Sequence, residues 1–203
     1  MKTALSLAVA AVAALSLAAC NKPASTTTTE TKSVTTSAVD NAQDAVGAAV
    51  GQTSAATVGS HDSGAFVSNA SQGDIYEIEA GKIAGSRSRS ADIKAFAKMM
   101  VTDHTATSKA LAPLAAAAGE TPADKLDERR QGFIDNLKSA PAADFDKTYV
   151  DQQVAAHEEA LTLMQGYATG GGDPGLKDAA AKTAPKVQQH LDQIKAIQAA
   201  MKS

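Results

Sequence analysis

The stretch from residue 90 to residue 114 decides the fold, and it reads SADIKAFAKMMVTDHTATSKALAPL. Its apolar side chains recur every three or four residues, which is the period of an α-helix with one buried face. That face carries Ile93, Phe96, Ala97, Met100, His104, Thr107, Leu111 and Leu114. Ser90 is a favourable N-cap and Asp92 is a favourable first-turn acid, so the pattern predicts a long helix that begins after Ser90.

The same helical period continues on both sides of this stretch. It predicts three further long helices, over residues 63–86, over residues 142–168, and from the cap Asp173 onward. A shorter helix is expected to start at Thr121 and Pro122 and to end before Pro141. No alternating strand pattern is present, so the fold class is all-α. The long connection with its extra helix favours a ferritin-like four-helix bundle, over residues 63–203, with a long crossover.

The N-terminal segment has the features of an export signal. Residues 1–19 combine a positive start at Lys2 with a short apolar run and small residues before Cys20. The tetrapeptide Leu17-Ala18-Ala19-Cys20 resembles the lipobox of bacterial lipoprotein precursors. The resemblance implies that Cys20 becomes the mature N-terminus and carries acyl chains, and two or more chains give a stable membrane anchor.

The residues after Cys20 indicate where the protein is held. Asn21 follows the cysteine in place of an aspartate, which favours the outer membrane over retention in the inner one. We therefore expect a lipid-anchored protein of the bacterial cell envelope that faces the periplasm. Residues 20–62 are rich in Ser, Thr and Ala, which predicts a flexible tether with at most a transient helix over residues 39–50.

The composition excludes several classes of function. The formal net charge is −3, whereas a nucleic-acid surface would be basic, so no nucleic-acid partner is expected. Only 3% of the residues are aromatic and Trp is absent, which disfavours a sugar-binding cleft or a base-stacking platform. Cys20 is the single cysteine, so an internal disulfide is excluded. Packing or a metal ion must therefore stabilise the fold.

Three histidines fall on the apolar faces of three different predicted helices. These are His104, His157 and His190, and Glu77 occupies the same kind of position on the first long helix. Burial of such groups is costly unless they have partners, and a shared cation would satisfy them together. We therefore predict one transition-metal ion (Zn, Fe, Cu or Mn) bound by these four residues, with Asp103 and Gln153 as supporting groups.

Two observations limit the chemistry of this cluster. The residue three positions before each histidine is a valine, so the Glu-x-x-His pairs of dinuclear carboxylate sites are absent. No Ser-His-Asp order, Gly-x-Ser-x-Gly elbow or His-Glu-x-x-His motif is present, and no catalytic residue is predicted. A redox enzyme with an open metal position is a third reading, and the residues support it least.

The alternative is that the histidines are ordinary core residues at different heights in the bundle. They would then form hydrogen bonds with Tyr76, Tyr149, Gln153 or Asp103. In that case the bundle would be a non-enzymatic spacer or a surface for protein partners in the envelope. The position of the three imidazoles along the bundle axis distinguishes the two readings.

The four helix sequences together resemble a known family. They read IYEIEAGKIA from residue 75, FAKMMVTDHT from residue 96, FDKTYVDQQVAAH from residue 145 and PKVQQHL from residue 185. The chain is similar over about residues 65–197 to domain-of-unknown-function family 4142, whose members are labelled predicted outer membrane proteins. The resemblance implies export, a ferritin-like bundle and an envelope location, but no established activity. The family's hallmark positions correspond to Glu77, Asp103, His104, Gln153, His157 and His190.

Overall fold

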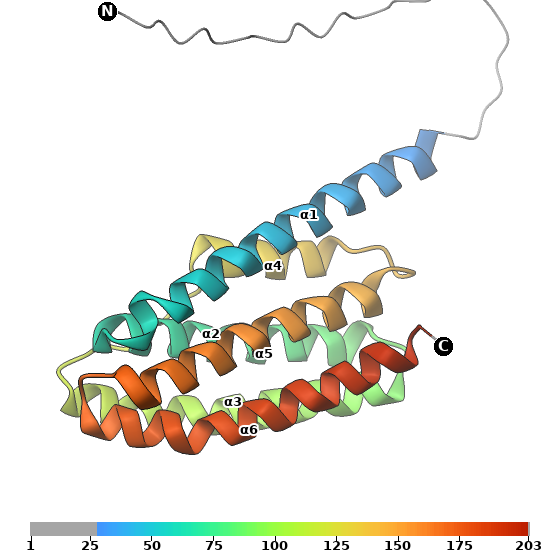
Figure 1. Ribbon diagram of the computed structural model, residues 1–203. Helices are drawn as coiled ribbons and strands as arrows, with labels where there is room; N and C mark the ends of the chain where they lie inside the picture. Colours follow the sequence, from blue (N-terminus) through green and yellow to red (C-terminus); the bar gives the residue numbers. More distant parts are fainter. Residues whose placement is uncertain (1–27, 203) are drawn as a thin grey trace, which may run out of the picture.

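The computed structural model describes residues 28–202, with side chains from residue 38 onward, and all of its regular elements are helical. The described residues form six α-helices and one short 3-10 helix, and Figure 1 shows how the α-helices are arranged. They are α1 (Thr28–Ala56), η1 (Val58–Ser60), α2 (Ser63–Arg87), α3 (Ala91–Ala117), α4 (Glu128–Ser139), α5 (Phe145–Gly170) and α6 (Pro174–Ala200). The described part of the chain contains no strand, which confirms the predicted all-α fold class. The predicted export signal and Cys20 lie outside the described residues.

Four long helices form two antiparallel pairs. Short links after Arg87 and after Gly170 join α2 to α3 and α5 to α6 (Figure 1). Asp62, Ser90 and Asp173 cap the starts of α2, α3 and α6 by accepting a hydrogen bond from the backbone three residues on. The two pairs meet where α2 packs on α5 and α3 packs on α6.

Small residues bring the paired helices close together. At Gly81 of α2, a Cβ atom would lie 2.8 Å from the carbonyl oxygen of Ala97 on α3. That separation is shorter than side chains tolerate, so only glycine permits this crossing. The close approach of the two backbones fixes the height of α3 relative to α2, and with it the height of His104 relative to α2.

The apolar core is divided into two clusters along the helices. One contains Phe66, Leu111, Leu163, Tyr167 and Leu176, and the other contains Tyr76, Phe96, Tyr149, Leu191 and Ile194, each with further neighbours. Along α3, α5 and α6 the histidine lies between residues of one cluster and residues of the other. The histidines therefore occupy a polar layer between two apolar regions.

The connection between α3 and α5 differs from the prediction. We expected its helix to start at Thr121 and Pro122, but α4 begins only at Glu128, after the cap Asp127. Residues 119–127 form no helix, and their backbone is tied to α2 instead. The backbone N–H of Ala123 donates to Ser71 Oγ at 2.8 Å, and that of Asp127 donates to the Gln72 side chain at 2.9 Å.

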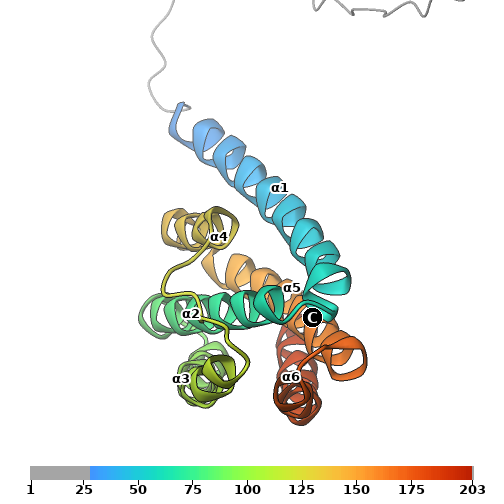
Figure 2. The same ribbon diagram turned by 90° about the vertical axis from the view of Figure 1, so that its left-hand side faces the viewer.

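The segment that we expected to be a flexible tether contains a long helix. Helix α1 (Thr28–Ala56) crosses the outer side of α5 and α4 (Figures 1 and 2). The prediction was wrong because it relied on the small number of large apolar side chains in this segment, and other contacts hold the helix. Gly51 and Ala55 are buried by close approach, and the Asp44 carboxylate accepts hydrogen bonds of 2.7 Å from Asn136 and from Gln152. Within the described residues, no helix is long and apolar enough to cross a membrane.

Candidate metal centre

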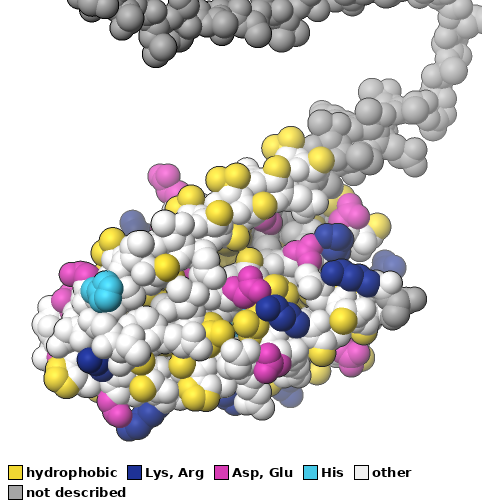
Figure 3. Space-filling model, viewed as in Figure 1, with side chains coloured by type: hydrophobic (Ala, Val, Ile, Leu, Met, Phe, Trp, Pro, Cys, Tyr) yellow, Lys and Arg dark blue, Asp and Glu magenta, His cyan; other side chains and the backbone are white. Residues whose placement is uncertain are grey.

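The structure brings His104, His157 and His190 together from three helices. The ring centroid of His104 lies 6.2 Å from that of His157 and 6.0 Å from that of His190. The centroids of His157 and His190 lie 5.6 Å apart. One ligand nitrogen from each ring lies within 4.8 Å of the other two. His157 and His190 are almost fully buried, and Figure 3 accordingly shows little histidine on the molecular surface in that view. The three imidazoles are close enough to bind one metal ion.

Helix α2 orients the imidazole of His104. Its Nδ1 lies 2.7 Å from Oδ1 of Asp74. A carboxylate accepts hydrogen bonds, so Nδ1 carries the proton and donates. Thr107 and Ser108 also donate to the Asp74 carboxylate, at 2.8 and 3.0 Å, and fix its plane. The other ring nitrogen, Nε2, is buried and has no hydrogen-bond partner among the described residues.

The other two imidazoles are arranged in the same way. His157 Nδ1 donates to the backbone carbonyl of Gln153 at 2.8 Å, and His190 Nε2 donates to Oδ2 of Asp103 at 3.0 Å. The second nitrogen of each ring, Nε2 of His157 and Nδ1 of His190, is buried without a partner in the described part of the chain. Each histidine thus has one nitrogen held by an acceptor and one free lone pair, as metal-ligating histidines do.

The surroundings also favour neutral imidazoles at two of the three positions. Burial lowers the pKa of His157 to about 3, and the neighbouring His104 adds to that effect. Burial lowers the pKa of His190 as well, although Asp103 opposes the shift. At His104, burial acts in the same direction, but the hydrogen bond to Asp74 and the charge of Glu77 outweigh it and raise the pKa. Among the three histidines, His104 is therefore the one whose pKa lies above its ordinary value.

Glu77 lies beside the cluster and not at its centre. Glu77 is 4% exposed, and its Oε1 lies 3.7 Å from His157 Nδ1, the nitrogen that already donates to a carbonyl. Its second oxygen has no hydrogen-bond partner among the described residues. Burial raises the pKa of Glu77 to about 7. Of the four predicted ligands, the structure brings the three histidines into one group and leaves Glu77 outside it.

The two predicted supporting residues contact the histidines in different ways. Asp103 does so through its carboxylate, which also lies 3.4 Å from Nζ of Lys186. Gln153 does so through its backbone carbonyl. Its side-chain amide is buried near Glu77, where it favours the charged carboxylate without forming a hydrogen bond of good geometry.

Sequence reasoning missed Asp74. It is buried, and it makes the shortest side-chain contact to any of the three imidazoles. The available signal was its position three residues before Glu77, since residues at that spacing share one face of a helix.

This set of donors suits a transition metal. Neutral imidazole is a good ligand for Zn, Cu, Fe and Ni, and three such ligands leave at least one coordination position for water or another molecule. The orienting partners belong to the kinds that accompany metal-bound histidine, namely two carboxylates and one backbone carbonyl.

Fold and site together define an all-α protein in which three histidines, two buried and one partly buried, converge from three helices. A sequence model of the family described as "Domain of unknown function (DUF4142)" matches residues 48–197, and the chain belongs to that family. The matched range includes the last turns of α1 and nearly all of the chain from α2 to α6. No curated protein and no solved structure matches the chain.

Proposed function

We propose that this protein is a lipid-anchored protein of the bacterial envelope that binds one transition-metal ion between its helices, in metal handling or in protection of the envelope under stress. The observation that carries this proposal is the set of three unpartnered, buried ring nitrogens on His104, His157 and His190. Buried polar atoms in folded proteins nearly always have partners, and a polar group buried without one carries a free-energy cost. A single ion would satisfy all three.

The alternative reading, in which the histidines are core hydrogen-bonders, accounts for only half of the contacts. It explains the three nitrogens that face Asp74, Asp103 and the Gln153 carbonyl, but it leaves the other three without a role. The tyrosines do not fill that gap. Tyr76 donates its hydroxyl hydrogen to Gln152 at 3.1 Å, and the hydroxyl of Tyr149 has no partner within the described residues.

A ferritin-like four-helix bundle is the architecture that we propose for α2, α3, α5 and α6. Two antiparallel pairs joined by one long connection, which here contains α4, are consistent with that class. In such bundles, metal sites are formed by side chains that project inward from facing helices. The three histidines project from α3, α5 and α6 in this manner.

We further propose that acyl chains on Cys20 attach the protein to the outer membrane, with the domain in the periplasm. Seven residues separate Cys20 from the first residue of α1. A fully extended chain of that length spans at most about 25 Å, so the helical domain would stay near the bilayer. Labelling of cells with a radioactive fatty acid tests the anchor. The wild-type protein should take up label and the Cys20→Ser variant should not, whereas equal labelling of both would contradict the proposal.

Elemental analysis of the full chain, purified in detergent without a histidine tag, tests the metal site. We expect about one metal ion per chain, as a mononuclear site requires, and its loss in both His104→Ala and His190→Ala. His61→Ala is the matched control, because His61 is exposed and its Nδ1 lies 3.3 Å from the carbonyl oxygen of Gly170, away from the cluster. A folded wild-type protein that takes up no Zn, Fe, Cu or Mn would overturn the proposal.

A further inference from the structure

A cavity of about 310 Å³ adjoins the three histidines. It is lined by residues of all four long helices that form the two pairs, and by Arg129, Arg130 and Phe133 of α4. Glu77, His104, His157 and His190 are among its polar lining residues. The remaining walls are mostly apolar and include Phe66, Leu111, Leu114, Leu163, Met164 and Val187. The cavity therefore combines the proposed metal ligands with mostly apolar walls.

The cavity opens between α3 and α6. Among its lining residues, only Ala106, Ala110 and Lys186 are exposed, and all three belong to these two helices. On α6, the small side chains of Ala179, Ala180 and Thr183 also line the cavity along this seam between α3 and α6. Figures 1 and 2 show that α3 and α6 lie on the side of the molecule opposite α1 and α4. The opening is thus on the face away from the helix that leads to the N-terminus.

We propose that this cavity binds a small, uncharged, largely apolar molecule that carries one oxygen donor, and that this oxygen occupies the open coordination position of the metal. The inference rests on the proposed metal site and adds the class of molecule that the site takes. Ligand pockets of this kind combine predominantly apolar walls with a few polar groups that fix the orientation of the ligand.

The size of the cavity sets the size of the molecule. A cavity of about 150 Å³ in another protein holds one benzene ring, so a volume about twice as large suits a bicyclic aromatic or a medium-length aliphatic compound. Most of the molecule would contact the apolar walls, and it would enter along the alanine-lined seam at Ala106 and Ala110.

The charges around the histidines disfavour an anion. The carboxyl groups of Asp74, Asp103 and Glu77 all lie close to the imidazoles and oppose the approach of an anion. Lys186, at the opening, lies 3.4 Å from the Asp103 carboxylate and is paired with it. The two arginines in the lining do not offset this charge. Arg129 and Arg130 donate to the Glu159 carboxylate at 2.8 and 2.7 Å, and Arg130 also pairs with Asp127.

Calorimetric titration of the full chain with naphthol, naphthalene and naphthoate tests this inference. Naphthol should bind the Zn-loaded protein at least about tenfold more tightly than the metal-free protein, because only the loaded protein offers the coordination position. Naphthalene, which lacks the oxygen, should bind both forms equally. Naphthoate should bind the loaded form at least about tenfold more weakly than naphthol, since its charge meets the carboxylates.

Two substitutions at cavity-lining positions of α3 test whether naphthol binds in the cavity. Ala110→Phe, and Ala106→Phe as a second variant, should fill the opening and lower naphthol affinity by about tenfold or more without changing the zinc content. Ala112→Phe is the matched control, because Ala112 is exposed on the same helix but does not line the cavity, and it should change neither quantity.

The results separate this inference from the metal proposal. A protein that carries zinc but does not bind naphthol, or binds it equally well in the Ala110→Phe and Ala106→Phe variants, would overturn the cavity inference alone. Tighter binding of naphthoate than of naphthol would also overturn it. A protein that takes up no zinc would overturn both proposals, and the measured metal content shows which case applies.

Discussion

His104 and Asp74 connect α3 to α2 through the shortest side-chain contact to any of the three imidazoles, 2.7 Å between Nδ1 and Oδ1. This contact selects the ring nitrogen that carries the proton and turns the other nitrogen toward His157 and His190. A carboxylate in this role raises the basicity of the imidazole and holds its plane. The affinity of the site for metal therefore depends on a residue that does not itself bind the ion.

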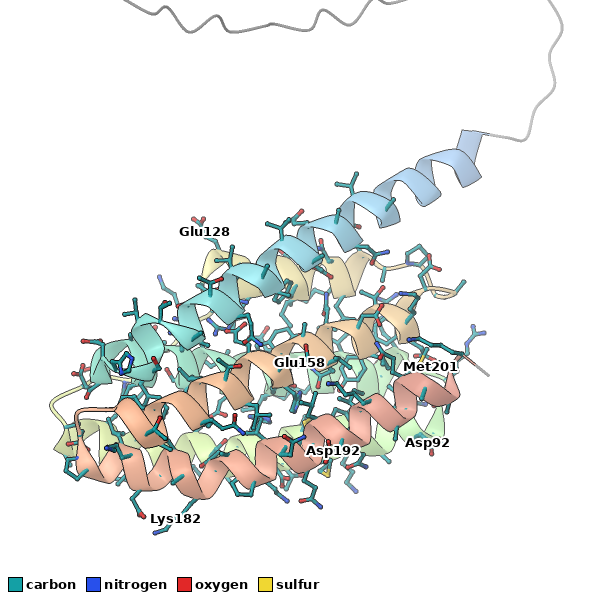
Figure 4. The ribbon with its side chains drawn as sticks, viewed as in Figure 1. Asp92, Glu128, Glu158, Lys182, Asp192 and Met201 are labelled. Carbon is teal, nitrogen blue, oxygen red and sulfur yellow. The ribbon has the colours of Figure 1, made fainter. Side chains whose placement is uncertain are left out.

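Replacement of Asp74 by Asn should weaken metal binding without unfolding the protein. We expect the Kd for zinc, measured by competition with a chelator, to rise about 10- to 100-fold, as is typical when an orienting partner of a metal ligand is lost. Asp92→Asn is the control, because Asp92 is exposed near the start of α3 and points to solvent (Figure 4). An unchanged Kd in Asp74→Asn would show that Asp74 does not orient His104.

Metal affinity should depend on pH mainly through His104. Burial lowers the pKa of His157 to about 3 and lowers that of His190 as well, so these two rings should release fewer protons on metal binding than His104 does. The raised pKa of His104 means that zinc must displace a proton there. Below the pKa of His104, the logarithm of the apparent zinc affinity should therefore fall by about one unit per pH unit. A fall of about three units per pH unit would mean that all three histidines titrate together, and pH-independent binding would exclude histidine ligation.

Replacement of Glu77 by Gln should stabilise the metal-free protein at neutral pH. The pKa of Glu77 is about 7 in the fold against an ordinary value of 4.5, so the folded state binds more protons than the unfolded state between these values. The stability of the wild type consequently falls as pH rises through this window. The difference in unfolding free energy between Glu77→Gln and wild type should grow, by on the order of 3 kcal/mol, from pH 4.5 to pH 7.

Urea unfolding with a chelator present, at several pH values across that window, measures this difference. Glu128→Gln serves as the control, because Glu128 is exposed on α4 and points to solvent (Figure 4). Its difference from wild type should stay constant with pH. A constant difference for Glu77→Gln as well would mean that the Glu77 carboxyl titrates normally in the fold.

Helix α1 should contribute to the stability of the domain through Gly51. A Cβ atom at this position would overlap the Glu159 carboxylate and the Arg129 guanidinium, which form a buried ion pair beneath α1. Gly51→Ala should therefore destabilise the protein by about 1–3 kcal/mol, the usual cost of overpacking. At Gly85 of α2, by contrast, a Cβ atom meets nothing within 4 Å, so Gly85→Ala should stabilise by about 0.5–1 kcal/mol. Thermal unfolding measures both, and an unaffected Gly51→Ala variant would mean that α1 does not pack as described.

Local signals in the sequence were sufficient to place most of the helices. The caps Ser90 and Asp173 and the helical period around them identified α3 and α6, because capping and amphipathic spacing act over a few residues. The same reasoning failed at Thr121 and Pro122. At that point contacts with another helix outweigh the local signal, because the side chains of Ser71 and Gln72 on α2 accept hydrogen bonds from the backbone of the connection.

The candidate site was predictable in part for the same reason. His104, His157 and His190 were found because each occupies an apolar face, which the helical period reveals. That Glu77 lies outside the converging group and that Asp74 orients His104 both depend on how α2 is set against α3 and α5. The close crossing at Gly81 helps to set that geometry, and no local pattern encodes it. Helix α1 was missed because its contacts rely on small residues and on Asp44, which sequence periodicity does not mark.

X-ray absorption spectroscopy at the zinc edge of the loaded protein tests whether the three histidines share one metal ion, because it counts and identifies the ligands. We expect three imidazole nitrogens at about 2.0–2.1 Å, completed by an oxygen ligand. A spectrum with one imidazole or none, in a protein that holds its zinc, would contradict the account that His104, His157 and His190 share one metal ion.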